Sequence, residues 1–293
     1  MHWQTSRFKI DLSQPQVMGI VNVTPDSFSD GGQHATATAA SAHCEKLVRD
    51  GAHILDIGGE SSRPGAAPLP VEVELARVLP VLREAVRLGV PVSIDTYKPQ
   101  VMQAALDLGA DIVNDIWALR WIEATDQGQA LTGTAVVSRH ASCGVCLMHM
   151  HGEPQTMQRR PMEGDAMQQV AAFLEQAADA LIAVGVARDR VVLDPGIGFG
   201  KTVAQNFGLL ARQRALLALG FPLLAGWSRK SSLAAVTGVS LQSVAALEAN
   251  DRMVPSVAAA VLAVERGARI VRVHDVRETV AALKVWQAAS TEH

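Results

Sequence analysis

Residues that could do chemistry recur along this chain where a short apolar run ends. In the clearest case, the run Val191–Leu193 leads to Asp194 and then to a loop rich in glycine and proline that reaches Lys201. A short apolar run bounded by turn residues predicts a buried strand, and glycines let the following loop approach a ligand closely. The segment therefore places a carboxylate beside a loop that is suited to form part of an active site.

Two familiar phosphate-binding motifs nearly fit this loop, and both fail. A Walker loop needs a glycine five residues before its Gly-Lys-Thr, where this chain has Pro195. The dinucleotide fingerprint needs its third glycine one residue later than Gly200, and no acidic residue follows at the required distance. The loop is therefore of another kind.

The pattern of apolar run, polar end and loop occurs eight times. The predicted strands are Val17–Asn22, His53–Ile57, Pro91–Asp95, Ile112–Asp115, Val145–His149, Val191–Leu193, Phe221–Ala225 and Ile270–His274. Segments with helical spacing lie between and after them: Thr36–Asp50, Val71–Leu88, Pro99–Leu108, Gln168–Val184, Leu209–Ala218, Val254–Arg266 and Thr279–Ala288. The stretch 117–142 is less regular, and we expect a helix there with a polar loop around 126–133. Eight such units predict an α/β fold, a (β/α)8 TIM barrel, with residues 1–293 as a single domain.

In such a barrel the loops that follow the strands meet at one end, so the polar strand ends should face one mouth. Three of them offer acceptors and an amide that suit a flat, nitrogen-rich heterocycle: Asp95, Asn114 and Asp194. Five residues add donors and positive charge that suit phosphate or pyrophosphate: Asn22, Arg63, Lys230, Arg272 and His274. Any one aspartate here could instead be a helix cap or a loop brace, and Arg272 with His274 could form an ordinary ion pair. The prediction of a binding site therefore rests on the repetition of polar strand ends, and not on any one residue.

Composition narrows the classes of function. The chain is 48% hydrophobic with a net charge of −3, which gives no electrostatic footprint for nucleic acid or an anionic membrane. The apolar run 215–227 is shorter than the roughly 20 residues that span a bilayer, and the N-terminus lacks the apolar core of a signal peptide. We therefore expect a cytoplasmic protein with no membrane or nucleic-acid partner.

Three cysteines do not make a disulfide framework. The pair Cys143 and Cys146, with His140 and His149 nearby, resembles a metal site in composition. Strand alternation would however send Cys146 and His149 to opposite faces, so we do not expect a metal there.

Five segments, taken together and in order, resemble the dihydropteroate synthases of folate biosynthesis: Met18–Gly32, Asp56–Gly65, Asp194–Lys201, Ser228–Ser231 and Arg272–Asp275. The resemblance covers nearly the whole chain. It implies a (β/α)8 barrel that forms a homodimer. It also implies transfer of the methylene group of 6-hydroxymethyl-7,8-dihydropterin pyrophosphate to the amine of p-aminobenzoate, with release of pyrophosphate.

The resemblance also assigns roles to residues. The pterin is held by Asp95, Asn114, Asp194 and Lys230. The pyrophosphate and its Mg²⁺ are served by Asn22, Arg63, Arg272 and His274, with Asn22 as the metal ligand. The p-aminobenzoate faces Ser62, Pro64, Phe199 and Ser231. The catalytic residues are Asp95, Lys230, Arg272 and His274. This suits the chemistry, because departure of pyrophosphate leaves a cationic methylene that a buried carboxylate stabilises.

The second substrate has a predicted anchor at Ser231, which should begin a helix running to about Thr237. The free N–H groups of a helix start favour a carboxylate, although Ser231 could instead be a plain N-cap.

Four positions depart from the family pattern: Ser62, Trp117, His151 and Pro255. None removes a named catalytic group. Two rival functions are a methyltetrahydrofolate corrinoid methyltransferase, which has no reason to keep residues 228–230 and the long early loops, and a non-catalytic pterin-binding paralogue, which stays open.

Overall fold

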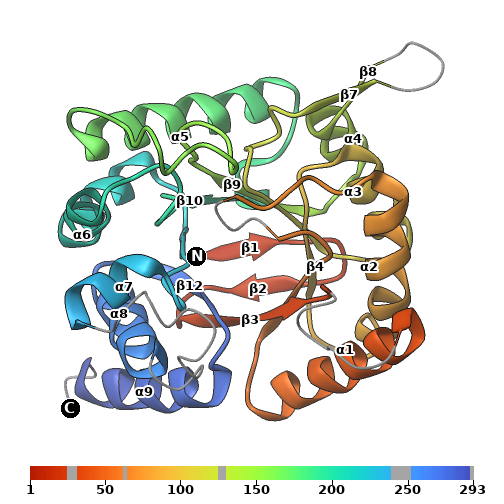
Figure 1. Ribbon diagram of the computed structural model, residues 1–293, viewed down its shortest axis with the longest axis horizontal. Coiled ribbons are helices and arrows are strands. Elements are labelled where there is room, and N and C mark those ends of the chain that lie inside the picture. Colours follow the sequence, from red (N-terminus) through yellow and green to blue (C-terminus); the bar gives the residue numbers. More distant parts are fainter. Residues whose placement is uncertain (25–31, 62–64, 125–129, 239–251, 291–293) are drawn as a thin grey trace.

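A closed barrel forms the centre of the molecule (Figure 1). This computed structural model describes residues 1–24, 32–61, 65–124, 130–238 and 252–290. Within those ranges eight parallel strands close on one another in sequence order: β3 (Gln16–Asn22), β4 (Ile54–Gly58), β5 (Val92–Asp95), β6 (Ile112–Asp115), β9 (Gly144–Met148), β10 (Val191–Asp194), β11 (Leu223–Ala225) and β12 (Ala268–Val273). The predicted barrel is confirmed.

The strands are apolar on both faces because both faces are covered. Inward-pointing residues of seven strands form one apolar layer inside the barrel: Met18, Ile54, Ile112, Cys146, Val192, Leu224 and Ile270. Outward-pointing residues such as Leu55, Val113 and Leu193 pack against the surrounding helices. Continuous burial of this kind is typical of parallel strands.

A ring of helices surrounds the barrel (Figure 1). They are α1 (Gly32–Arg49), α2 (Val71–Ala85), α3 (Pro99–Asp107), α4 (Gly133–Arg139), α5 (Ala166–Ala183), α6 (Val203–Ala211), α7 (Ser231–Thr237), α8 (Met253–Glu265) and α9 (Val276–Ser290). Local sequence sets their ends, as at α6, where Thr202 and Gln205 form a reciprocal capping box. Among the described helices, none combines the length and the apolar character needed to cross a bilayer.

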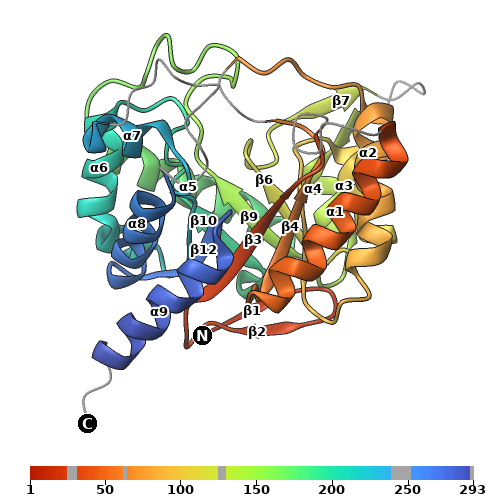
Figure 2. The same cartoon turned by 60° about the horizontal axis from the view of Figure 1, so that its bottom comes forward.

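A short antiparallel hairpin, β1 (His2–Gln4) with β2 (Lys9–Asp11), covers one end of the barrel (Figure 2). Trp3 is fully buried there and its indole N–H donates to the carbonyl of Arg190 at 2.9 Å. With Ile10 and Leu12 it continues the apolar layer of the barrel interior. The open mouth is therefore the opposite end, where the strands finish.

The stretch after β6 differs from the prediction of a helix with a polar loop. The structure has an antiparallel hairpin, β7 (Ile122–Ala124) with β8 (Ala130–Thr132), and only then the short helix α4. The reason lies at Asp115, whose carboxylate accepts the N–H groups of Trp117 and Leu119, both at 2.7 Å. Leu119 adopts a positive φ of 61°, which a helix cannot contain.

Two smaller differences concern one helix and the N-terminal residues. The predicted helix 209–218 is in fact the end of α6 followed by a 3-10 helix, Gln213–Leu219. The residues before the first predicted strand form the hairpin of β1 and β2, which the sequence analysis did not predict.

Candidate active site

A polar layer lies above the apolar layer, at the mouth of the barrel. Its centre is the guanidinium of Arg272 on β12, which donates from Nε to Asp56 Oδ2 and from Nη2 to Asp95 Oδ2, both at 2.5 Å. Asn114 on β6 donates from Nδ2 to the same Asp56 oxygen at 3.2 Å. Four strands thus converge on one network, because each places its polar residue on the inner face.

Burial shifts the ionisation of these groups. It raises the pKa of Asp95 to about 7, although the positive charge of Arg272 opposes the shift. Burial also raises the pKa of Asp194, against a hydrogen bond of 2.7 Å from the Gly196 N–H to its Oδ1. Burial alone would lower the pKa of Arg272, but the carboxylates of Asp56 and Asp95 outweigh it and raise that pKa. The floor of the mouth therefore holds two carboxylates, Asp95 and Asp194, whose pKa values burial raises.

Lys230 reaches the same mouth from the loop after β11. Its Nζ lies 4.2 Å from the centroid of the Phe199 ring, a cation–π contact. Burial lowers the pKa of Lys230 to about 8, while the charge of Asp194 acts in the opposite direction. The preceding residue, Arg229, has a positive φ of 57° and is held by an ion pair with Asp275 at 2.7 Å. This strained turn aims the Lys230 side chain inward.

The remaining predicted groups lie at the same end of the barrel. His274 follows β12, and its Nδ1 lies 2.9 Å from the hydroxyl of Ser228. Asn22 ends β3 beside Gly58 of β4. Ser231 is the first residue of α7 and is exposed, whereas Lys230 occupies the N-cap position without a side-chain cap hydrogen bond. The alternative that Ser231 caps this helix is therefore wrong.

Direct contacts join only part of the predicted set. Asp95, Asn114 and Arg272 share one network through Asp56, and Lys230 contacts Phe199. Asn22, His274 and Ser231 lie at the same mouth on separate elements. Ser62, Arg63 and Pro64 lie outside the described residues, so their placement stays a prediction.

Asp56 is the functional residue that sequence reasoning missed. It is fully buried, and it holds both Arg272 and Asn114. The sequence did contain a signal for it. Asp56 lies two residues after Ile54 in the same strand, and residues two apart lie on the same face, so an inward-facing Ile54 predicts an inward-facing Asp56.

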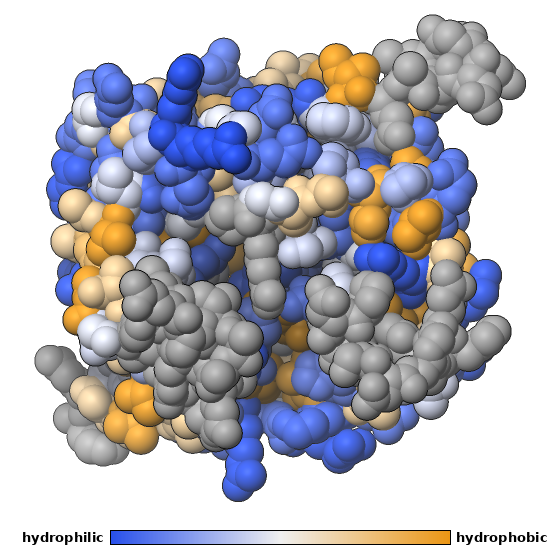
Figure 3. Space-filling model, viewed as in Figure 1, coloured by the Kyte–Doolittle hydropathy of each residue, from blue (hydrophilic) through white to orange (hydrophobic). Residues whose placement is uncertain are grey.

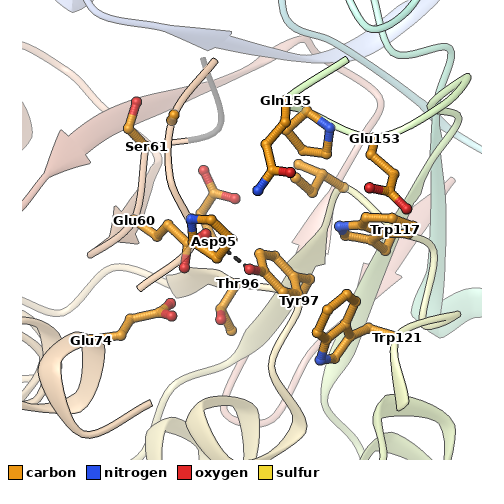
Figure 4. Close-up of a pocket in the computed structure, with 14 residues that line it drawn as sticks. Glu60, Ser61, Glu74, Asp95, Thr96, Tyr97, Trp117, Trp121, Glu153 and Gln155 are labelled. Carbon is orange, nitrogen blue, oxygen red and sulfur yellow. Dashed lines mark hydrogen bonds between the residues drawn. The ribbon is translucent and has the colours of Figure 1, made fainter. Parts of the chain in front are cut away.

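A cavity of about 260 Å³ opens beside Asp95 (Figure 4). The rings of Tyr97, Trp117 and Trp121 form one wall, with centroids 5.1–6.3 Å apart. The Tyr97 hydroxyl donates to Glu60 at 2.9 Å, which orients that ring. Trp117, a departure from the family pattern, thus belongs to an aromatic wall at the edge of the mouth.

The pair Cys143 and Cys146 is divided between two layers of the barrel. Cys146 lies in the apolar interior layer, whereas Cys143 lies in the outer core and accepts a hydrogen bond from Arg190 at 3.1 Å. Burial raises the pKa of both thiols, so both are kept in the neutral form.

The chain matches the family model described as "Pterin binding enzyme" over residues 18–274. It is 48% identical over 291 residues to a dihydropteroate synthase of Neisseria meningitidis serogroup B, with 98% of this chain and 96% of that protein covered. The fold matches a crystal structure of Xanthomonas albilineans dihydropteroate synthase with 4-aminobenzoic acid, with a TM-score of 0.86, 45% identity and coverage of 97% and 96% of the two chains. A structure of the Xanthomonas albilineans enzyme in complex with 7,8-dihydropteroate matches with a TM-score of 0.83, 43% identity and 97% coverage of each chain.

These matches extend over nearly the full length of both partners, and they agree with the barrel and with the charged groups at its mouth. The chain belongs to the dihydropteroate synthase family of pterin-binding enzymes.

Proposed function

We propose that this chain condenses 6-hydroxymethyl-7,8-dihydropterin pyrophosphate with p-aminobenzoate to give 7,8-dihydropteroate and pyrophosphate. The observation that carries the proposal is the network at the mouth of the barrel in which Arg272 joins the carboxylates of the buried Asp56 and the partly buried Asp95. It provides an acidic floor for the pterin and a cation for the pyrophosphate within one site. The full-length identity with dihydropteroate synthases supports the same reaction.

The reaction breaks the bond between the pterin methylene carbon and the pyrophosphate oxygen, and the electron pair leaves with pyrophosphate. The amine nitrogen of p-aminobenzoate then forms the new C–N bond and loses a proton. Asp95 lies where a carboxylate can stabilise the positive charge on the methylene, and Arg272 and His274 can take up the negative charge of the leaving group. Asn114, Asp194 and Lys230 hold the pterin ring.

The second substrate lies on the other side of the methylene. Phe199 and Ser231 face it in this proposal, together with Ser62 and Pro64, which lie outside the described residues. The p-aminobenzoate carboxylate lies at the start of α7, where Lys230 leaves the first N–H groups without a side-chain cap.

Mg²⁺ is part of the proposal. In the described part of the chain, no group of three or more His, Cys, Asp or Glu side chains could hold a metal ion. This fits Mg²⁺ bound through Asn22, water and substrate phosphates, because Mg²⁺ keeps several waters and rarely uses an all-protein cage. When bound, the ion would neutralise negative charge on the pyrophosphate, with Arg63, Arg272 and His274 as its neighbours.

A homodimer is also proposed. Helices α7, α8 and α9 lie together on one side of the barrel (Figure 1) and carry exposed apolar residues, among them Val236, Val254, Leu262 and Val285. Figure 3 shows a small hydrophobic area at the corner where α9 lies, with similar areas elsewhere on this face. Covering such residues favours association of two copies, and light scattering after gel filtration would measure the mass. A cytoplasmic location is proposed from the sequence alone.

One assay tests the reaction against its rivals. Purified protein is incubated with dihydropterin pyrophosphate, with and without p-aminobenzoate, and pyrophosphate release is measured. We expect release that depends on p-aminobenzoate. Binding of the pterin without release would indicate a non-catalytic paralogue, and transfer of a methyl group from methyltetrahydrofolate to a corrinoid would indicate the methyltransferase.

A further inference from the structure

Lys201 holds a buried ammonium group in the loop between β10 and α6. Its residue exposure is 2%, and its Nζ donates to the carbonyls of Gly196 at 2.8 Å and Phe199 at 3.1 Å. The third partner is Nδ1 of His149 at 2.9 Å. The carbonyl of His149 lies at 3.3 Å as a fourth, longer contact. An ammonium has three hydrogens and no acceptor, so these four buried acceptors engage all of its donors.

His149 is suited to accept this bond. Burial lowers its pKa to about 3, and the charge of Lys201 lowers it further, so the ring is neutral near pH 7. Its ring packs edge-on against Phe173 with centroids 5.0 Å apart. The end of β9 is thus a fixed acceptor for the Lys201 side chain.

The loop between β10 and α6 packs closely against the backbone of the residues that follow β9. A Cβ on Gly196 would lie 1.8 Å from the His149 carbonyl oxygen, and one on Gly200 would lie 2.1 Å from that of His151. Both glycines have positive φ angles of 66–67°. Only glycine permits this close approach of the two backbones. The Lys201 ammonium links them, because it donates to both the loop and the residues after β9.

The same loop carries Phe199, whose ring contacts Lys230. The Phe199 N–H donates to the Gly196 carbonyl at 3.1 Å, so Lys201 binds both ends of that turn. Movement of the ammonium would move the backbone of Phe199 directly.

We propose that Lys201 is a positioning residue for the second substrate, because it fixes the turn that presents Phe199 to p-aminobenzoate and to Lys230. The inference rests on the proposed function, in which Phe199 faces that substrate. The Lys201 side chain lies in the joint between the residues that follow β9 and the loop, where its Nζ donates to carbonyls of both.

The charge state of Lys201 supports the assignment. Burial lowers its pKa to about 7; Asp194 acts to raise it and Lys230 to lower it, and His149 is its neutral neighbour. A neutral amine has one hydrogen fewer, so it satisfies fewer of the four buried acceptors around Nζ. The KM for p-aminobenzoate is therefore expected to rise as pH increases through about 7.

Two variants test the role. Lys201→Met keeps the length and removes all donors, whereas Lys201→Gln keeps two donor hydrogens. We expect the KM for p-aminobenzoate to rise in the order Lys, Gln, Met, by about tenfold or more for Met, which corresponds to about 1.4 kcal/mol. The kcat is expected to change much less, because a ring contact from Phe199 contributes equally to ground-state and transition-state binding. Lys46→Met, which removes an exposed ammonium paired with Asp50, is the matched control.

Amide hydrogen exchange of residues 196–201 gives a readout that needs no turnover. Faster exchange in Lys201→Met than in the wild type and in Lys46→Met supports the positioning role, even if the wild-type protein fails to release pyrophosphate. A fall in kcat that matches a loss of folded protein, with unchanged KM and unchanged exchange, overturns it. Pyrophosphate release by the wild type separately decides the proposed function.

Discussion

Replacing Asp56 by asparagine should destabilise the fold and weaken the active site together. The substitution keeps the shape of the side chain and removes the negative charge that faces Arg272. Arg272 then has Asp95 as its one remaining carboxylate partner among the described residues. Because Asp56 is fully buried, water cannot compensate for the lost negative charge.

The magnitude follows from this geometry. A single hydrogen bond to a charged group contributes about 1.5 to 3 kcal/mol, and an orphaned buried charge costs about 3 to 5 kcal/mol. Arg272 keeps one anchor, so we expect the free energy of unfolding to fall by about 2 to 4 kcal/mol, between those two cases. The KM for dihydropterin pyrophosphate is expected to rise as well, because the guanidinium is less firmly oriented.

Denaturant unfolding measures the loss, with Asp165→Asn as the control. Asp165 also pairs with an arginine, Arg212, through two hydrogen bonds of 2.7 and 3.0 Å, but both side chains are about half exposed. Exposed pairs contribute little, and asparagine caps α5 as well as aspartate does, so that variant should unfold nearly as the wild type does. Equal losses in the two variants would refute the idea that the Asp56 carboxylate anchors Arg272.

Asp95→Asn is expected to lower kcat by about 10² to 10³ while pterin binding changes less, and a loss confined to KM would contradict the catalytic role. Because burial raises the pKa of Asp95 to about 7 and the reaction needs its carboxylate form, kcat/KM should fall as pH drops below about 7; the Asp95→Asn variant should lack this limb of the pH profile. Excess EDTA is expected to suppress pyrophosphate release and added Mg²⁺ to restore it, whereas full turnover in EDTA would remove the metal from the proposal. An aniline of similar basicity without the carboxylate should lose about 1 to 3 kcal/mol in kcat/KM; equal performance would show that no anion site at the start of α7 binds p-aminobenzoate.

Much of the barrel could be predicted because its strands are short, apolar and bounded by polar residues. Each of the eight predicted strands overlaps an observed strand, and most predicted helix limits fall within a few residues of the observed ones. Predicted and observed strands agree because both faces of each strand are buried, and such strands have continuous apolar runs in the sequence. Helix ends were also readable where a stop is local, as at Gly109, which follows α3 with a φ of +99°.

The stretch after β6 could not be predicted in the same way, because its conformation depends on a contact with a residue outside it. Asp115 looks like one more polar strand end, but its carboxylate binds two backbone N–H groups and shapes the turn that follows. Burial raises its pKa to about 7, which is the electrostatic cost of this bracing role. Sequence spacing does not distinguish an aspartate that faces a ligand from one that braces its own loop.

The candidate site shows the same division. Residue type and position at strand ends predicted five of its members: Asp95, Asn114, Asp194, Lys230 and Arg272. Those criteria find groups that reach the mouth. They do not identify the residues that hold those groups in place.

Asp56 and Lys201 are two such supporting residues, and they act on opposite sides of the mouth. Asp56 fixes Arg272 from β4, and Lys201 fixes the Phe199 turn from beneath the loop after β10. Both are almost fully buried, so each interaction is formed away from water, where a misplaced charge costs most. The apolar layer of the barrel interior lies beneath this polar layer and excludes water from it. The same burial that raises the pKa of Asp95 therefore also makes its charge more effective toward a developing cation, and it requires that every neighbouring charge be held by a partner such as Asp56.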